Sequence, residues 1–124
     1  MTVQILVVDD EMDIPRMIRD YLEDVTEYKV DIAPSGEAAL EMCSRLHPQL
    51  CIVDMRLPDM TGNEFILAAH GKVPGCKFII HTGSLDYTIP AELLEIGLND
   101  EAILFKPVLS LANFVEKIQQ LLGL

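Results

Sequence analysis

The stretch Ile5-Leu6-Val7-Val8-Asp9-Asp10-Glu11 joins a continuous apolar run to three acidic residues. A continuous run of this kind predicts a strand that is covered on both faces, as in a parallel sheet. Three further segments have the same apolar character: residues 50–53, 78–80 and 102–105. Residues 28–32 instead alternate apolar and polar side chains, which is typical of an edge strand. We therefore expect five strands.

Helical patterns occupy the segments between these strands, with apolar residues recurring every three or four positions. The residues expected to cap or precede the five helices are Asp13, Ser35, Thr61, Thr88 and Ser110. Thr61 and Glu64 have the spacing of a capping box. In the fourth helix we expect Leu93, Leu94 and Ile96 to face inward and Gly97 to end the helix.

Strands that alternate with helices indicate an α/β fold, a doubly wound five-stranded parallel sheet with helices on both faces and right-handed crossovers. A length of 124 residues is that of one domain. We find no internal repeat and no linker. We therefore expect a single domain over residues 1–124, with no output domain attached.

Composition excludes several classes of function. Nine basic and twenty acidic residues give a net charge of −11, so binding to nucleic acid or to an anionic membrane surface is not expected. The first residues lack a basic signal-peptide region, and no apolar run reaches the length of a membrane span. Three cysteines, Cys43, Cys51 and Cys76, have no zinc-site spacing and are interpreted as reduced thiols in the core. We expect a cytoplasmic protein.

Reactive side chains follow four of the five expected strands. Asp9 and Asp10 follow the first strand, Asp54 the third, Thr82 the fourth and Lys106 the fifth. Each could separately be a turn former, a cap or a surface residue. Because ligands of such sheets bind at the carboxyl ends of the strands, we interpret the set together as a functional site.

The chemistry of this set is specific. Clustered carboxylates repel one another unless a cation neutralises them, and oxygen ligands suit Mg²⁺ or Mn²⁺. A carboxylate oxygen can then attack phosphorus and form an aspartyl phosphate. A lysine ammonium and a hydroxyl can stabilise the negative charge of the transferred group.

With these residues in view, the chain resembles a response-regulator receiver domain of the CheY-like kind, either stand-alone or part of a longer regulator. The matching segments occur in family order: Leu6-Val7-Val8-Asp9-Asp10-Glu11, Asp54-Met55-Arg56-Leu57-Pro58-Asp59-Met60-Thr61-Gly62, His81-Thr82-Gly83 and Phe105-Lys106-Pro107. The resemblance covers the whole chain and implies the flavodoxin-like strand order 2-1-3-4-5.

The resemblance also implies a role for each site residue. Asp54 would accept a phosphoryl group from a sensor histidine kinase or phosphotransfer protein. Asp10, supported by Asp9, would bind Mg²⁺ together with Asp54 and the main-chain carbonyl of Arg56. Thr82 and Lys106 would contact the phosphoryl group, and the bond from Lys106 to Pro107 would be cis. The domain would catalyse its own phosphorylation on Asp54 and its slow autodephosphorylation, and be no enzyme otherwise.

Two features depart from the family pattern. The position three residues before Lys106 is often an aromatic switch residue, and here it is Ile103. The stretch from residue 97 to residue 106 is slightly long. We expect the fourth helix and fifth strand to carry the response to phosphorylation and to bind an unknown downstream protein.

Four alternatives follow from the same residues. A flavin binder of this topology needs a glycine- and hydroxyl-rich phosphate loop where this chain has acidic residues. A phosphatase with an aspartate nucleophile typically has a second Asp where this chain has Arg56. A pseudo-receiver would act only as an interaction module, and a phosphorelay intermediate would pass the phosphoryl group on. His81 has no neighbouring ligand in the sequence and is interpreted as a packed core residue.

Overall fold

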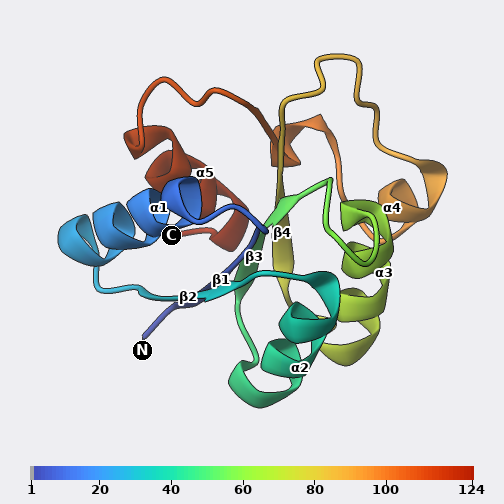
Figure 1. The fold of residues 1–124 in the computed structure, drawn as a ribbon, viewed down its shortest axis with the longest axis horizontal. Coiled ribbons are helices and arrows are strands. Elements are labelled where there is room, and N and C mark those ends of the chain that lie inside the picture. Colours follow the sequence, from blue (N-terminus) through green and yellow to red (C-terminus); the bar gives the residue numbers. More distant parts are fainter. Residues whose placement is uncertain (1) are drawn as a thin grey trace.

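The computed structural model describes residues 2–124 and contains a five-stranded sheet between two helical layers (Figure 1). The strands are β1 (Gln4–Val8), β2 (Lys29–Ala33), β3 (Leu50–Asp54), β4 (Lys77–Thr82) and β5 (Ile103–Phe105). All neighbouring strands are parallel, in the order β2-β1-β3-β4-β5. The predicted fold and strand order are confirmed.

The helices are α1 (Asp13–Val25), α2 (Gly36–Leu46), α3 (Gly62–Lys72), α4 (Ala91–Glu95) and α5 (Ala112–Leu122). Helices α1 and α5 cover one face of the sheet, and α2, α3 and α4 cover the other (Figure 1). Each face has its own apolar core. In β1, Ile5 and Val7 belong to the core under α1 and α5, whereas Leu6 and Val8 belong to the core on the opposite face. Alternate residues enter opposite cores, and this explains why the central strands are apolar without interruption.

Two of the predicted helix starts form as expected. The Ser35 hydroxyl accepts a hydrogen bond from the backbone N–H of Ala38, and Thr61 and Glu64 form the complete capping box. The prediction for Asp13 is wrong, because α1 already begins at that residue and follows Met12, whose side chain forms no cap. Ser110 lies two residues before α5, and its hydroxyl accepts a 3.3 Å hydrogen bond from the backbone N–H of Ala112.

The region of α4 differs most from the prediction. The helix begins after Pro90 rather than after Thr88, and it is only five residues long. Pro90 disfavours helical backbone at the residue before it, so the helix does not extend back toward Thr88, which lies in the preceding loop. Leu93 is buried as predicted, but Leu94 is 53% exposed because a helix this short turns only one apolar side chain fully inward.

In the segment between α4 and β5, the helix ends and a short turn begins within a few residues. Gly97, at φ +103°, ends α4 as predicted, in a conformation that L side chains rarely adopt. A 3₁₀ turn, Asp100–Ala102, follows, and the side chain of Asn99 caps it by accepting from the backbone N–H of Glu101. This turn accounts for the extra length noted in the sequence. The turn also includes Ala102, so the fifth strand begins one residue later than predicted.

Two expectations from composition can be compared with the fold. No helix within residues 2–124 is both long and apolar enough to cross a membrane. Cys43, Cys51 and Cys76 are buried free thiols, and the Sγ atoms of Cys51 and Cys76 are 3.7 Å apart. Their interpretation as core residues is confirmed.

Candidate functional site

The carboxyl ends of β1 and β3 bring three carboxylates together. Asp9 and Asp10 directly follow β1, and Asp54 is the last residue of the neighbouring strand β3. One ligand oxygen from each carboxylate lies within 4.8 Å of the others. Asp9 is buried, the side chain of Asp54 is 12% exposed, and Asp10 is open to solvent.

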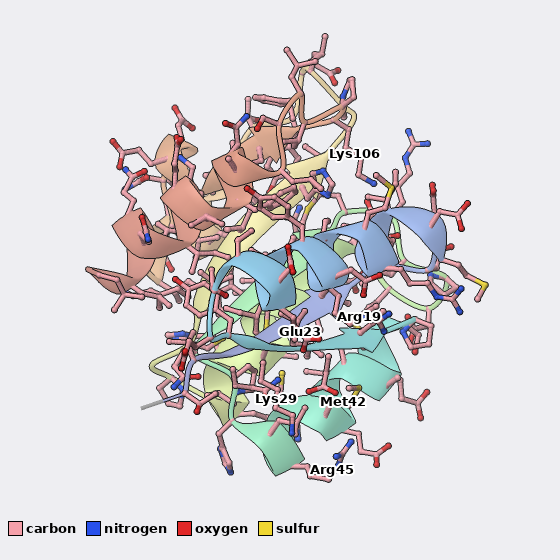
Figure 2. All side chains as sticks on the ribbon, turned by 90° about the vertical axis from the view of Figure 1, so that its left-hand side faces the viewer. Arg19, Glu23, Lys29, Met42, Arg45 and Lys106 are labelled. Carbon is pink, nitrogen blue, oxygen red and sulfur yellow. The ribbon has the colours of Figure 1, made fainter. Side chains whose placement is uncertain are left out.

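Lys106 supplies a positive charge between these carboxylates. It directly follows β5, and its Nζ lies 3.8 Å from Asp9 Oδ2 and 3.7 Å from Asp54 Oδ1. Its backbone N–H donates a 2.7 Å hydrogen bond to the carbonyl of Thr82, and its bond to Pro107 is cis. Figure 2 shows Lys106 at the end of the molecule opposite Lys29 and Arg45.

The net negative charge of the carboxylate cluster favours the binding of a cation. Burial raises the pKa of Asp9, while the hydrogen bond from the Glu11 N–H and the Lys106 ammonium lower it by less. With all three carboxylates ionised, one ammonium neutralises only one of three negative charges. A compact set of oxygen donors with excess negative charge fits a hard divalent cation such as Mg²⁺ or Mn²⁺.

A pocket of about 480 Å³ opens over this cluster. Its lining residues are Asp10, Glu11, Asp54, Arg56, Thr82, Gly83, Ser84 and Lys106. The backbone N–H of Arg56 donates to Asp54 Oδ1 at 3.3 Å, and its side chain is exposed. The structure therefore brings all the sequence-predicted site residues to one place, with Asp9 beside the pocket and contacting Lys106.

The loop after Asp54 contains two positioning residues that sequence reasoning missed. A Cβ atom at Gly62 would lie 2.7 Å from the carbonyl oxygen of Asp54 and 2.8 Å from the Cα of Met55, so only glycine fits there without a shift. The Asp59 carboxylate accepts hydrogen bonds from the backbone N–H groups of Gly36 and Glu37, at 2.9 and 2.8 Å. These bonds hold the pKa of Asp59 below its usual value and join the loop to the start of α2. The bonds of Asp59 join segments 22 and 23 residues apart, and no spacing signal in the sequence indicates them.

The end of β4 presents its side chains to two different environments. Thr82 lines the pocket, and its Oγ1 accepts a 3.1 Å hydrogen bond from the backbone N–H of Ser84. His81 is only 4% exposed and packs edge-on against Phe114, with ring centroids 5.2 Å apart. Burial, with a smaller contribution from the Lys106 charge, lowers the pKa of His81 to about 4. The interpretation of His81 as a core residue is confirmed.

Known proteins share sequence and fold with this chain. A family model described as the response regulator receiver domain matches residues 5–119. The regulatory protein LuxO of Vibrio cholerae is 32% identical over 102 residues, which are 81% of this chain and 21% of LuxO. This chain thus spans about a fifth of the length of that curated relative.

Two solved structures share the fold over nearly the whole of both chains. The chemotaxis protein CheY4 of Vibrio cholerae is 25% identical with a TM-score of 0.81, covering 98% of this chain and 99% of its own. A CheY-like receiver domain protein of Methanospirillum hungatei is 30% identical with a TM-score of 0.75, covering 99% and 95%.

Proposed function

This chain belongs to the response regulator receiver domain family of two-component systems, and we propose that Asp54 is its phosphoacceptor. One observation carries the proposal. Asp54 lies in an open pocket between two further carboxylates and the ammonium of Lys106, with the Thr82 hydroxyl lining the same pocket. This combination provides a nucleophile, cation ligands and donors for a phosphoryl group.

Phosphoryl transfer to Asp54 exchanges one bond to phosphorus for another. A carboxylate oxygen of Asp54 forms the new P–O bond while the P–N bond to a histidine of the donor breaks. The electron pair of the broken bond returns to the imidazole, which takes up a proton. Lys106, 3.7 Å from Asp54 Oδ1, offsets the negative charge of the transferred group, and the Thr82 hydroxyl donates a hydrogen bond to one of its oxygens.

The proposed metal ligands are Asp9, Asp10, Asp54 and the main-chain carbonyl of Arg56. Their oxygen-only donor set favours Mg²⁺, with Mn²⁺ as the alternative. When bound, the divalent cation neutralises the clustered carboxylates and the charge of the incoming phosphoryl group. Asp9 is buried, and the hydrogen bond from the Glu11 N–H keeps its carboxylate in position within the cluster.

The donor in this proposal is a sensor histidine kinase or a phosphotransfer protein. The output is binding of a downstream protein to the face formed by α4 and β5, where Leu94 and Phe105 are 53% and 39% exposed. Nucleic acid and membranes are not partners of this acidic domain. The domain, residues 1–124, acts on itself rather than on a released substrate, and its three free thiols suit the reducing cytoplasm.

A second function is favoured by one observation. Ile103 occupies the position where the family often has an aromatic switch residue, so the domain could relay or store phosphoryl groups without switching a partner. We propose the switching function as the first candidate, because the loop after Thr82 is hydrogen-bonded to the Thr82 hydroxyl and can respond to it.

The proposal is tested by incubating the protein with acetyl phosphate and Mg²⁺ and measuring its intact mass. We expect the mass gain of one phosphoryl group, no gain in Asp54→Asn, and an unchanged gain in Asp24→Asn, which removes an exposed carboxylate on α1. Undiminished phosphorylation of Asp54→Asn would overturn the assignment. Steady release of phosphate from a generic ester would favour the phosphatase alternative, and a purified protein that is yellow would favour the flavin binder.

A further inference from the structure

The loop between β4 and α4, residues 83–90, is attached to α3 by one side-chain hydrogen bond. The hydroxyl of Tyr87 donates to Asn63 Oδ1 at 2.7 Å. Tyr87 is half-buried and packs against the core on the α2–α4 face of the sheet. Within residues 2–124, no other donor on this loop forms a hydrogen bond with α3. This bond therefore sets where the loop lies relative to α3.

The same loop is bonded back to the phosphoryl-contacting residue Thr82. The N–H of Ser84 donates to Thr82 Oγ1 at 3.1 Å, and the N–H of Tyr87 donates to the carbonyl of Ser84 at 3.1 Å. The Ser84 hydroxyl also donates to Asp86 Oδ1 at 2.6 Å. Residues 84–87 thus form a closed turn, so that a displacement of Ser84 is carried to Tyr87.

On the other side of the bond, Asn63 has a fixed position relative to Asp54. Asn63 follows Gly62, whose N–H donates to the carbonyl of Met55 at 3.0 Å and where an added Cβ would lie only 2.7 Å from the Asp54 carbonyl oxygen. The capping box of Thr61 and Glu64 further holds this end of α3. Hydrogen bonds and close packing therefore connect Thr82, Ser84, Tyr87 and Asn63 in series to the start of α3 beside Asp54.

We propose that Tyr87 is a positioning residue for Thr82, a role that rests on the proposed function of Asp54. The Tyr87–Asn63 hydrogen bond holds the 84–87 turn where the Thr82 hydroxyl accepts from Ser84. When Thr82 turns toward a phosphoryl group on Asp54, the N–H of Ser84 loses its acceptor, the turn shifts, and Tyr87 separates from Asn63. The bond therefore stabilises the unphosphorylated state and opposes the change in Thr82.

This assignment gives the domain an aromatic response element away from the position of Ile103. The aromatic ring lies on the loop itself, not on β5, and its hydroxyl is bonded to the helix that begins beside the phosphoacceptor strand. Because a hydrogen bond is either formed or broken over a short displacement, a small movement of the loop is sufficient to separate the two states.

The first measurement needs no phosphoryl group. Tyr87→Phe keeps the ring and removes the hydroxyl, and Asn63→Ala removes the acceptor. We expect each to increase the exchange rate of the Ser84 amide about threefold to tenfold, the effect of losing one hydrogen bond, with no further increase in the double variant. Tyr28→Phe, beside the opposite edge strand, is the matched control. An unchanged Ser84 exchange rate in Tyr87→Phe would overturn the proposal.

The second measurement is the affinity for beryllofluoride, a phosphoryl mimic, in the presence of Mg²⁺. Tyr87→Phe should bind it about threefold to tenfold more tightly, because only the free state loses a hydrogen bond. In a Thr82→Val background the same substitution should have no effect, a result that a general loosening of the loop would not produce. An equal or weaker affinity of Tyr87→Phe contradicts the proposal. If the wild-type protein binds no beryllofluoride, the function proposed for Asp54 fails, whereas Ser84 exchange still decides the role of Tyr87.

Discussion

The two halves of the pocket are built differently. On the β1–β3 side, the loop after Asp54 is held by the hydrogen bond from the Gly62 N–H to the Met55 carbonyl and by the bonds of Asp59 to α2. On the β4–β5 side, an eight-residue loop leads to a helix of five residues and a strand of three. Leu85 on that loop is 79% exposed.

Under the proposed function, this difference suits the two halves to separate tasks. Phosphoryl transfer requires the carboxylates to keep their mutual distances, and the β1–β3 side provides many contacts for that. A conformational response requires a segment that changes position at small cost, and such segments have few buried contacts and exposed backbone. In Figure 1 the loop before α4 projects beyond the sheet, apart from the packed helices.

The largest expected effect is a loss of stability at acid pH, caused by the buried His81 on β4. The folded protein keeps His81 neutral down to a pKa of about 4, whereas the unfolded chain takes up its proton near 6.5. The stabilisation is therefore complete above about pH 7 and is lost as the pH falls through this window, by about 3 kcal/mol at pH 4. Urea unfolding from pH 7 to pH 4 measures this loss.

The substitution His81→Gln isolates this contribution from other titrating groups. The variant should lose less of its free energy of unfolding between pH 7 and pH 4 than the wild type does, whereas His47→Gln, at an exposed helix end, should lose as much as the wild type. Equal losses in wild type and His81→Gln would show that a group other than His81 causes the acid sensitivity.

The second-largest effect tests whether the β1–β3 side binds the cation. Saturating Mg²⁺ should raise the free energy of unfolding by about 2.7 kcal/mol at a hundredfold excess over Kd, and Asp10→Asn should abolish most of this response. Without Mg²⁺, Asp10→Asn should be at least as stable as wild type, because one of the clustered charges is gone. Thermal unfolding at matched ionic strength measures both, and Asp24→Asn is the charge-matched control. A wild-type melting temperature that does not change with millimolar Mg²⁺ would refute the proposed cation site.

The smallest of these effects tests the rigidity of the β1–β3 side. Gly62→Ala places a methyl group against the backbone of Asp54 and Met55, and overpacking of this kind costs about 2 kcal/mol. The rate of phosphorylation by acetyl phosphate should also fall, because Asp54 must shift. Gly75→Ala is the control, since no atom lies within 4 Å of its new Cβ. Equal stability of both variants would mean that the loop is not held as described.

Local patterns in the sequence were sufficient to predict the sheet and the residues that meet at its edge. Each of Asp9, Asp54 and Lys106 stands at the end of an apolar run, and parallel strands bring such ends together. The capping box of Thr61 and Glu64 was predictable for the same reason, because both partners lie within one turn.

What the sequence did not predict depends on contacts between distant segments. Asp59 bonds to α2, and Tyr87 bonds to Asn63, across 22 or more residues. The inward orientation expected for Leu94 failed because it assumed a longer helix, and Asp13 failed as a cap because one residue's shift in a helix start changes the capping position.

The central claim is that phosphorylation on the β1–β3 side is detected on the β4–β5 side. Amide chemical shifts of the protein with Mg²⁺, before and after addition of beryllofluoride, test it most directly. We predict changes at Asp54 and Thr82 that continue through Tyr87 and α4 to Ile103, with α2 and β2 nearly unchanged. Changes confined to the pocket residues would contradict the account, and the domain would then be a phosphoryl relay or store rather than a switch.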